Sequence, residues 1–261
     1  MNREGRRVAM CLIGIALHAH EKYPFILIAN RDEFYERPTE RAQFWQDEPQ
    51  ILAGRDLKAM GTWLGVTSSG KVAALTNYRE PGEKPKERSR GDLPLDYLRT
   101  NQSITTYMEE VDSKSTEYNG FNLIAGHFNE LYYYSNRQNQ IIQMQEGIHG
   151  VSNHLLNSSW PKVDGLKNEL SNYLSSEPDI RIDHLFEMLN QAEPAPDEAL
   201  PHTGVPIEWE RMLSPIFIAS DSYGTRAQTI ITVNNEGHVT FTERSKGQKT
   251  NEKHFAFIIN R

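Results

Sequence analysis

The sequence predicts an α+β or layered α/β protein in which antiparallel sheets are covered on the outside by helices. Three observations favour this fold class. Most apolar segments are short and rich in β-branched and aromatic residues, as strands are. Turn-forming residues separate these segments. The order along the chain is strands, helices, strands, helices and strands, which indicates antiparallel sheets with helices packed against them.

Several neighbouring strands are expected to form hairpins. Ser68-Ser69-Gly70 would join one pair, and Asn234-Asn235-Glu236-Gly237 would join another. The uninterrupted apolar run at 25–29 indicates a strand that is covered on both faces. Strands are expected at residues 10–18, 24–30, 62–67, 71–77, 120–127, 130–135, 139–144, 148–153, 215–220, 226–233, 238–244 and 254–259.

Helical periodicity falls in two blocks. The first block covers about 92–112, and the second comprises 160–175, with Pro161 in its first turn, and 181–190. Residues 79–91 are dense in charge, proline and glycine, and residues 191–207 carry four prolines, so both are expected to be irregular. Because strands lie on both sides of these segments, we expect residues 10–261 to form a single domain.

Composition excludes several classes of protein. The net charge of −7 and the isoelectric point near 5.7 argue against a nucleic-acid partner. No stretch approaches the roughly 18 apolar residues that a membrane helix needs. The single cysteine excludes an internal disulfide, which fits a reducing cytoplasm. CxxC, HExxH and phosphate-binding glycine motifs are missing from the sequence, so we expect no metal site and no required cofactor.

That cysteine, Cys11, directly follows Met10 and opens an apolar run. If translation began at Met10, trimming of the methionine would leave Cys11 with both a thiol and a free α-amine. Such an amine, with a pKa of about 7.7–8.0, is a general base within reach of its own thiol. This is the chemistry of an N-terminal-nucleophile (Ntn) hydrolase. The alternative is a buried strand cysteine, which is common for this residue type.

Residues 1–9 are expected to be a leader that arises from a misplaced translation start. They are polar and basic, and they lack the apolar centre of a signal peptide. Back-translated, the run from Glu4 to Arg7 can be a purine-only stretch that resembles a bacterial ribosome-binding site upstream of the Met10 codon.

Polar clusters stand at the ends of apolar strands. The densest is Asn30-Arg31-Asp32-Glu33, in which an adjacent Arg and Asp could fix the ionisation of a nucleophile. Asn77 could donate to a developing oxyanion, Asn153 offers a second amide, and Arg226 could bind a carboxylate or stabilise a thiolate. Taken singly, each cluster could equally be a solvated turn. Two aromatic residues, Trp63 and Tyr78, could line a pocket.

Together these motifs resemble the NRDE family, which includes transport and Golgi organisation protein 2 of animals. The family is named for the cluster at 30–33. The resemblance runs from Met10 almost to the C-terminus and leaves residues 1–9 outside. The matching motifs include Met10-Cys11-Leu12, Gly61-Thr62-Trp63-Leu64-Gly65, Ala73-Ala74-Leu75-Thr76-Asn77, Gly150-Val151-Ser152-Asn153 and Tyr223-Gly224-Thr225-Arg226.

The resemblance implies a four-layer αββα fold similar to that of Ntn hydrolases. It also implies a distant likeness to the penicillin V acylase and bile-salt hydrolase group, although in that group the Arg and Asp are not adjacent. Six residues match the functional positions of that group in order, namely Cys11, Arg31, Asp32, Asn77, Asn153 and Arg226.

Two functions therefore remain open from the sequence. The first is an Ntn-type cysteine amidohydrolase that cleaves a non-peptide amide bond of a small acylated substrate. Its catalytic residues would be the six named above, and its substrate-binding residues would be Asn30, Glu33, Trp63 and Tyr78. The second, implied by the resemblance, is a non-catalytic protein that carries haem or a lipid in the same cleft. A pure interaction module is a third possibility.

Overall fold

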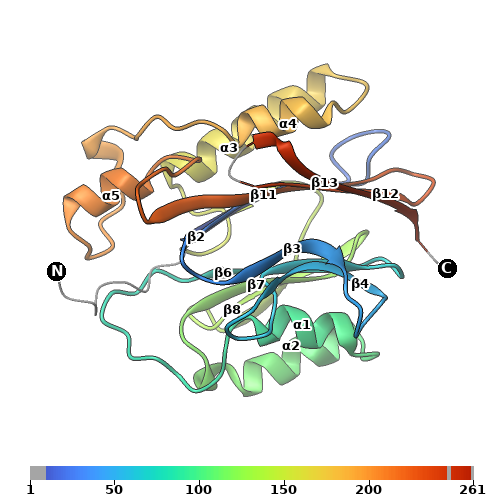
Figure 1. The fold of residues 1–261 in the computed structure, drawn as a ribbon, viewed down its shortest axis with the longest axis horizontal. Helices are drawn as coiled ribbons and strands as arrows, with labels where there is room; N and C mark the ends of the chain where they lie inside the picture. Colours follow the sequence, from blue (N-terminus) through green and yellow to red (C-terminus); the bar gives the residue numbers. More distant parts are fainter. Residues whose placement is uncertain (1–9, 246–247, 260–261) are drawn as a thin grey trace.

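The computed structural model describes residues 10–245 and 248–259, which form two antiparallel sheets between two layers of helices (Figure 1). The expected leader at 1–9 lies outside the described residues. The predicted α+β class and the four-layer arrangement are confirmed. No helix in the described part of the chain is both long enough and apolar enough to cross a membrane.

One sheet has six strands and carries the strand β1, which begins at Met10, next to its edge strand. Its order is β10 (Gly147–Val151), β1 (Met10–Leu17), β2 (Phe25–Phe34), β11 (Tyr223–Val233), β12 (His238–Ser245) and β13 (Gln248–Ile258). The other sheet has seven strands in sequential order. They are β3 (Thr39–Phe44), β4 (Ile51–Asp56), β5 (Leu64–Thr67), β6 (Lys71–Asn77), β7 (Phe121–His127), β8 (Glu130–Ser135) and β9 (Gln140–Gln143).

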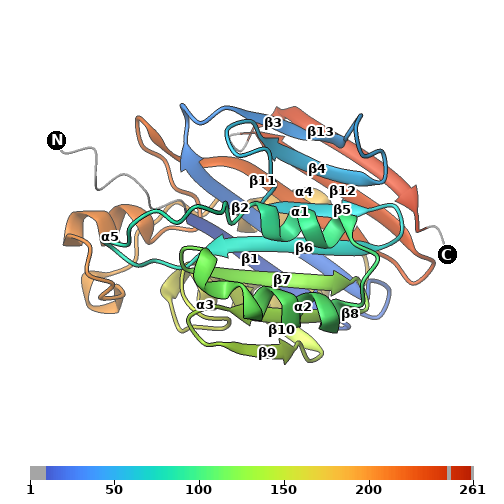
Figure 2. The ribbon, with the colours of Figure 1, turned by 90° about the horizontal axis from the view of Figure 1, so that it is seen from below.

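Helices cover the outer face of each sheet. The seven-stranded sheet is covered by α1 (Asp92–Arg99) and α2 (Ile104–Ser113), which lie in front of its strands in Figure 2. The six-stranded sheet is covered by α3 (Pro161–Ser176), α4 (Ile182–Met188) and α5 (Ile207–Leu213). Short 3-10 turns occur at Ser115–Glu117 and Asp197–Ala199.

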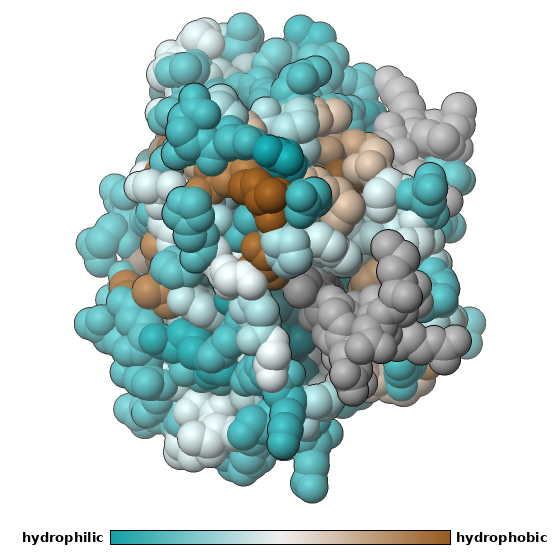
Figure 3. Space-filling view, turned by 90° about the vertical axis from the view of Figure 1, so that its left-hand side faces the viewer, coloured by the Kyte–Doolittle hydropathy of each residue, from teal (hydrophilic) through white to brown (hydrophobic). Residues whose placement is uncertain are grey.

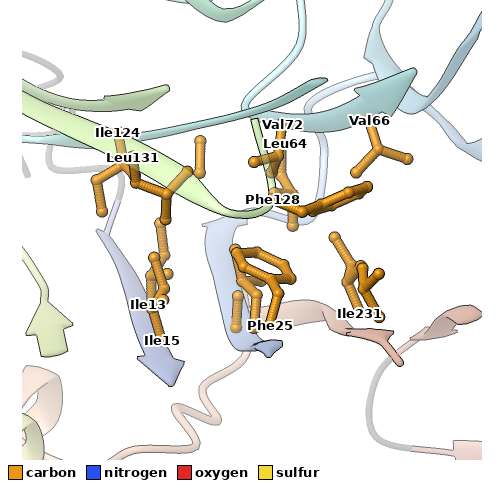
Figure 4. Close-up of a cluster of buried hydrophobic side chains, with 14 of the residues drawn as sticks. Ile13, Ile15, Phe25, Leu64, Val66, Val72, Ile124, Phe128, Leu131 and Ile231 are labelled. Atoms are coloured by element: carbon orange, nitrogen blue, oxygen red, sulfur yellow. The ribbon is translucent and has the colours of Figure 1, made fainter. Parts of the chain in front are cut away.

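The alternation of side chains along β1 and β2 divides the apolar residues between two cores. Ile13, Ile15 and Phe25 point toward the other sheet, where they meet residues such as Leu64 and Ile124 (Figure 4). Met10, Leu12, Ile26 and Ile28 point the other way and pack beneath α3 and α4. The prediction that 25–29 is covered on both faces is therefore confirmed. A third core lies between the seven-stranded sheet and its own helices.

Most of the expected elements are present, including both predicted hairpins. The helix expected at 92–112 is two helices, because Ser103 caps the start of α2 and its side chain accepts from the Thr106 N–H. The strand expected at 215–220 is wrong, since only an isolated bridge from Ala219 to Gly224 forms there. Ile216 and Ile218 are apolar because they pack beneath the helices.

Two strands and one helix were not expected. β3 is a polar edge strand in which only Ala42 is buried, so the sequence lacks an apolar pattern there. β4 and α5 are both short. The irregular segments expected at 79–91 and 191–207 are indeed largely without regular structure, and α5 begins where the second one ends.

Candidate functional site

Cys11 lies at the start of β1, and alternation along the strand places its side chain on the side of Ile13 and Ile15, between the two sheets. At this end the sheets enclose a cavity of about 940 Å³ that Cys11 lines. The thiol is largely buried, with 7% of the residue exposed. The surface at the end of the molecule where the chain enters β1 is mostly hydrophilic (Figure 3).

The cluster at 30–33 does not end the strand, as the sequence suggested, but forms the last part of β2. Cys11 pairs with Arg31 across the two strands. Because side chains alternate, Arg31 and Glu33 share the cavity face with Cys11, whereas Asn30 and Asp32 point toward the helices. Asp32 nevertheless forms part of the cavity lining, and Asn30 does not. Glu33 accepts from the Phe34 N–H at 2.9 Å and lies 3.5 Å from Nε of Arg37.

Asn30 lies away from the cavity. Its side-chain amide donates to the carbonyl oxygens of Leu189, at 2.9 Å, and Ile216, at 2.8 Å, and both belong to the segment that covers the sheet. Its own oxygen accepts from Nε2 of Gln228 at 3.2 Å. Asn30 therefore ties β2 to the helical layer, and the structure does not bring it together with the other predicted substrate-binding residues.

Asp32 is buried beside the N-terminal end of β1 and pairs in register with Met10. One carboxylate oxygen accepts from Oγ1 of Thr225 at 2.6 Å. The other, Oδ2, is buried and has no hydrogen-bond partner among the described residues. Burial raises the pKa of Asp32, while the positive charge of buried Lys162 opposes that rise. A carboxylate in this condition can accept one more charged donor.

The electrostatics keep the Cys11 thiol protonated while Met10 precedes it. Burial raises the pKa of Cys11 to about 12, and the negative charge of Asp32 adds to the rise. Arg31 and a hydrogen bond from the Asp32 backbone act in the opposite direction. In this form, desolvation outweighs the nearby cation, so the thiol is a poor nucleophile at neutral pH.

The seven-stranded sheet supplies Asn77 and Trp63, both of which line the cavity. Asn153 lies beneath Asn77, and its side-chain amide donates to the Asn77 carbonyl at 2.8 Å. The neighbouring hydroxyl of Ser152 donates to the Cys11 carbonyl at 2.9 Å. Asn153 does not line the cavity; with Ser152 it joins the ends of β1 and β6 and so sets the position of the site. Tyr78 also lies outside the cavity lining, and its ring packs 5.1 Å from that of His154.

Arg226 lines the cavity from β11. The register of β11 against β2 shifts between Thr225 and Ala227, so Arg226 is the extra residue of a β-bulge. Its guanidinium donates to the carbonyl oxygens of Phe34 at 3.0 Å and Arg37 at 2.7 Å. The structure thus gathers five of the six predicted catalytic residues at the cavity, and it places Asn153 behind them.

Three residues that the sequence did not single out also belong to this region. The Tyr223 hydroxyl accepts from the Met10 N–H at 2.8 Å. Buried Lys162 donates to the Leu213 carbonyl at 3.0 Å, and Arg90 lines the cavity from the irregular segment before α1. Tyr223 begins the sequence motif that ends at Arg226, whereas the roles of Lys162 and Arg90 arise from tertiary contacts alone.

Comparisons with known proteins bear on the family and the fold of this chain. The family model described as Transport and Golgi organisation 2 matches residues 10–248. The human homolog of Transport and Golgi organization protein 2 is 40% identical over 246 residues, which cover 87% of this chain and 88% of the human protein. The mouse homolog is 37% identical over 243 residues, which cover 85% of this chain and 87% of the mouse protein.

Two solved structures of the conjugated bile acid hydrolase from Clostridium perfringens are similar in fold. One, a mutant, has a TM-score of 0.51 over 97% of this chain and 93% of that chain, with 9% sequence identity. The other, a variant, has a TM-score of 0.54 over 95% and 92%, also with 9% identity. At this identity the likeness concerns the fold, which is Ntn-hydrolase-like. On the family model and the animal relatives, the chain belongs to the Transport and Golgi organisation 2 family.

Proposed function

We propose that the protein is an Ntn-type cysteine amidohydrolase that cleaves the amide bond of a small acylated substrate. The observation that carries this proposal is the buried oxygen Oδ2 of Asp32, which lacks a hydrogen-bond partner in the described part of the chain. Asp32 lies opposite Met10 in the strand register, and removal of Met10 would turn the backbone nitrogen of Cys11 into a terminal amine next to this pair. A free α-ammonium group on Cys11 would supply the missing charged donor.

The same change would activate the thiol. A positive charge on the α-nitrogen would stand next to the sulfur, and it would neutralise the Asp32 charge that now opposes ionisation. Both effects lower the pKa of Cys11 from its present value of about 12. The neutral amine could then take the thiol proton, as a general base does.

The reaction would proceed in two stages. The sulfur of Cys11 attacks the amide carbonyl carbon, and the resulting oxyanion is held by the Asn77 amide and a backbone N–H. One such donor contributes roughly 2.7–4 kcal/mol to the transition state. The α-ammonium group returns its proton to the departing amine as the C–N bond breaks. Water then hydrolyses the thioester and releases the acid and free Cys11.

A second function is favoured by the state of Cys11 when Met10 remains attached. Its thiol is then protonated, because its pKa is about 12. A cavity of about 940 Å³ with an inert thiol is large enough to hold haem or a lipid without turnover. The two functions therefore differ in one covalent feature, which is whether Cys11 carries a free amine.

The test compares two chains. One begins at Met10, so that removal of the methionine exposes Cys11, and the other is the full 261-residue chain. Intact mass establishes the N-terminus of each, and the rate of alkylation by iodoacetamide at pH 7.5 measures the thiolate. We expect the shorter chain to react at least tenfold faster and to hydrolyse an N-acyl anilide, with both properties lost in Cys11→Ala. If both chains were alkylated equally slowly, the proposed hydrolase function would be rejected and the binding of haem or a lipid would remain.

A further inference from the structure

The charges inside the cavity are not balanced. Apart from Asp32, the buried or half-buried carboxylates that line it have a cationic partner, and Glu33 shares Arg37 with Asp56. Asp56 binds Arg37 at 2.5 Å, and Glu243 lies 3.6 Å from Arg41. The remaining lining carboxylates, other than Glu33 and Asp32, are Glu36, Glu40 and Glu87, which are exposed at the rim. Exposed charges are screened by solvent and salt, so they contribute little to the field inside.

Two partly buried arginines in the lining have no carboxylate at ion-pair distance among residues 10–245 and 248–259. Arg90 donates to the Gly120 carbonyl at 2.9 Å, and Arg226 donates only to the carbonyls described above. Burial lowers the pKa of Arg90 to about 10, and for Arg226 the charge of Arg31 adds to the effect of burial. The negative charge of Glu33 acts on both arginines in the opposite direction, but it does not form an ion pair with either within the described residues. Both guanidinium groups remain charged at neutral pH.

Both arginines are also held in place around Cys11. The backbones of Cys11 and Arg226 lie on strands that flank β2, so they are separated by roughly 10 Å, twice the interstrand spacing. Arg90 approaches from the other sheet. The Gly91 carbonyl accepts from the Thr62 N–H at 3.1 Å, and a Cβ on Gly61 would come within 2.4 Å of that carbonyl oxygen. The segment carrying Arg90 is therefore packed closely against the start of β5.

We infer that the substrate carries a carboxylate, and that Arg90 and Arg226 bind it beside Cys11. This inference rests on the proposed hydrolase function and adds the class of substrate. A guanidinium fork matches a carboxylate with two parallel hydrogen bonds, and a partly desolvated cation without a direct ion pair gains most from such a ligand. Arg90 is thus a substrate-binding residue, and Arg226 contributes to the same anion site.

The first test uses two alkylating agents that differ in charge. Iodoacetate is an anion and iodoacetamide is neutral, and both react with the same thiolate. The ratio of their rate constants therefore cancels any change in the pKa of Cys11. In the chain that begins at Cys11, we expect this ratio to exceed that of a short peptide with an N-terminal cysteine by roughly tenfold. Raising the salt concentration should lower the ratio.

The variants Arg90→Gln and Arg226→Gln should each bring the ratio to within about threefold of the peptide value. The matched control is Arg99→Gln, which removes an arginine that pairs with Glu48 outside the cavity. Arg90→Lys keeps the charge but loses the fork, so an intermediate ratio is expected. A ratio equal to that of the peptide in the unmodified protein, or one unchanged by both glutamine variants, would overturn the inference.

A second measurement separates this inference from the proposed reaction. Cys11→Ala cannot react, so its affinity for N-octanoylglycine and for neutral N-octanoylethanolamine can be compared by calorimetry whether or not the protein is a hydrolase. We expect at least tenfold tighter binding of the anion, with the difference removed by Arg90→Gln. Equal affinities would overturn the carboxylate assignment even if amide hydrolysis is observed. Preference for the anion without hydrolysis would uphold the binding site and reject only the reaction.

Discussion

Asn30→Ala tests whether the cluster at 30–33 divides between two faces of β2. Asn30 carries the first letter of the motif, yet its side chain is fully buried and bonds to the helical layer. If this geometry is right, the substitution should lower stability and leave the cavity unaffected. If Asn30 instead binds substrate, the substitution should change reactivity at Cys11 with little effect on folding.

The magnitude follows from the three hydrogen bonds that the alanine removes. Each neutral hydrogen bond contributes about 0.5–1.5 kcal/mol net, and a buried group left without a partner costs about 1–3 kcal/mol. The Leu189 carbonyl keeps a donor in Gln228 at 3.1 Å, whereas the Ile216 carbonyl loses the donor described here. We therefore expect a loss of about 3 kcal/mol in the free energy of unfolding. For a chain of this length, that lowers Tm by about 6–12 °C.

Urea denaturation followed by circular dichroism measures this loss, with Asn172→Ala on the exposed face of α3 as the control. The control should change the free energy of unfolding by no more than about 0.5 kcal/mol. Iodoacetamide alkylation of the chain that begins at Cys11 should stay within about twofold of the unmodified rate. A loss of stability below about 1 kcal/mol, or a large change in alkylation, would refute the assignment of Asn30 to the helical layer.

Further predictions concern a buried ion pair, the cavity wall and the thiol. Arg79→Met leaves the buried carboxylate of Glu210, now 2.6 Å from the guanidinium, without its cation, and should cost about 3–5 kcal/mol in urea denaturation. Gly61→Ala forces a methyl group against the Gly91 carbonyl and should cost about 1–3 kcal/mol; an unchanged midpoint would contradict the close packing. In the full chain, alkylation of Cys11 should rise about tenfold per pH unit between pH 7 and 10 without levelling, because the pKa of the thiol is about 12 and the thiolate fraction grows with pH below the pKa. A plateau below pH 9 would contradict the raised pKa.

The sequence predicted the order of strands and helices better than the orientation of the side chains at the site. Apolar alternation and turn residues locate most strands, and the run at 25–29 correctly indicates a strand covered on both faces. The strand was expected to stop at Asn30, because a polar cluster was interpreted as the rim of the sheet. In the structure the strand continues to Phe34. Because side chains alternate along it, Arg31 and Glu33 lie on one face, and Asn30 and Asp32 lie on the other.

The remaining differences have tertiary causes. Arg90 stands in a segment whose charge density is equally typical of a solvated loop, and nothing local shows that it folds over the cavity. Lys162 follows Pro161 in the first turn of α3, where a lysine is normally exposed. The apolar residues at 215–220 have the spacing of a strand, but they are apolar because they pack into the core beneath the helices. The positions of such residues can be predicted only when the packing of distant segments is known.

The burial of Met10 has a consequence for timing. Its side chain has no exposed surface, its backbone N–H is bound by Tyr223, and its strand pairs with β2. An aminopeptidase or protease needs the bond before Cys11 in an extended, accessible form, which the folded protein does not offer. The choice between a blocked and a free cysteine must therefore be made on the nascent chain, before β1 enters the sheet. Afterwards a blocked chain can lose Met10 only if the protein unfolds and a peptidase cleaves the exposed bond, and a free Cys11 cannot become blocked again.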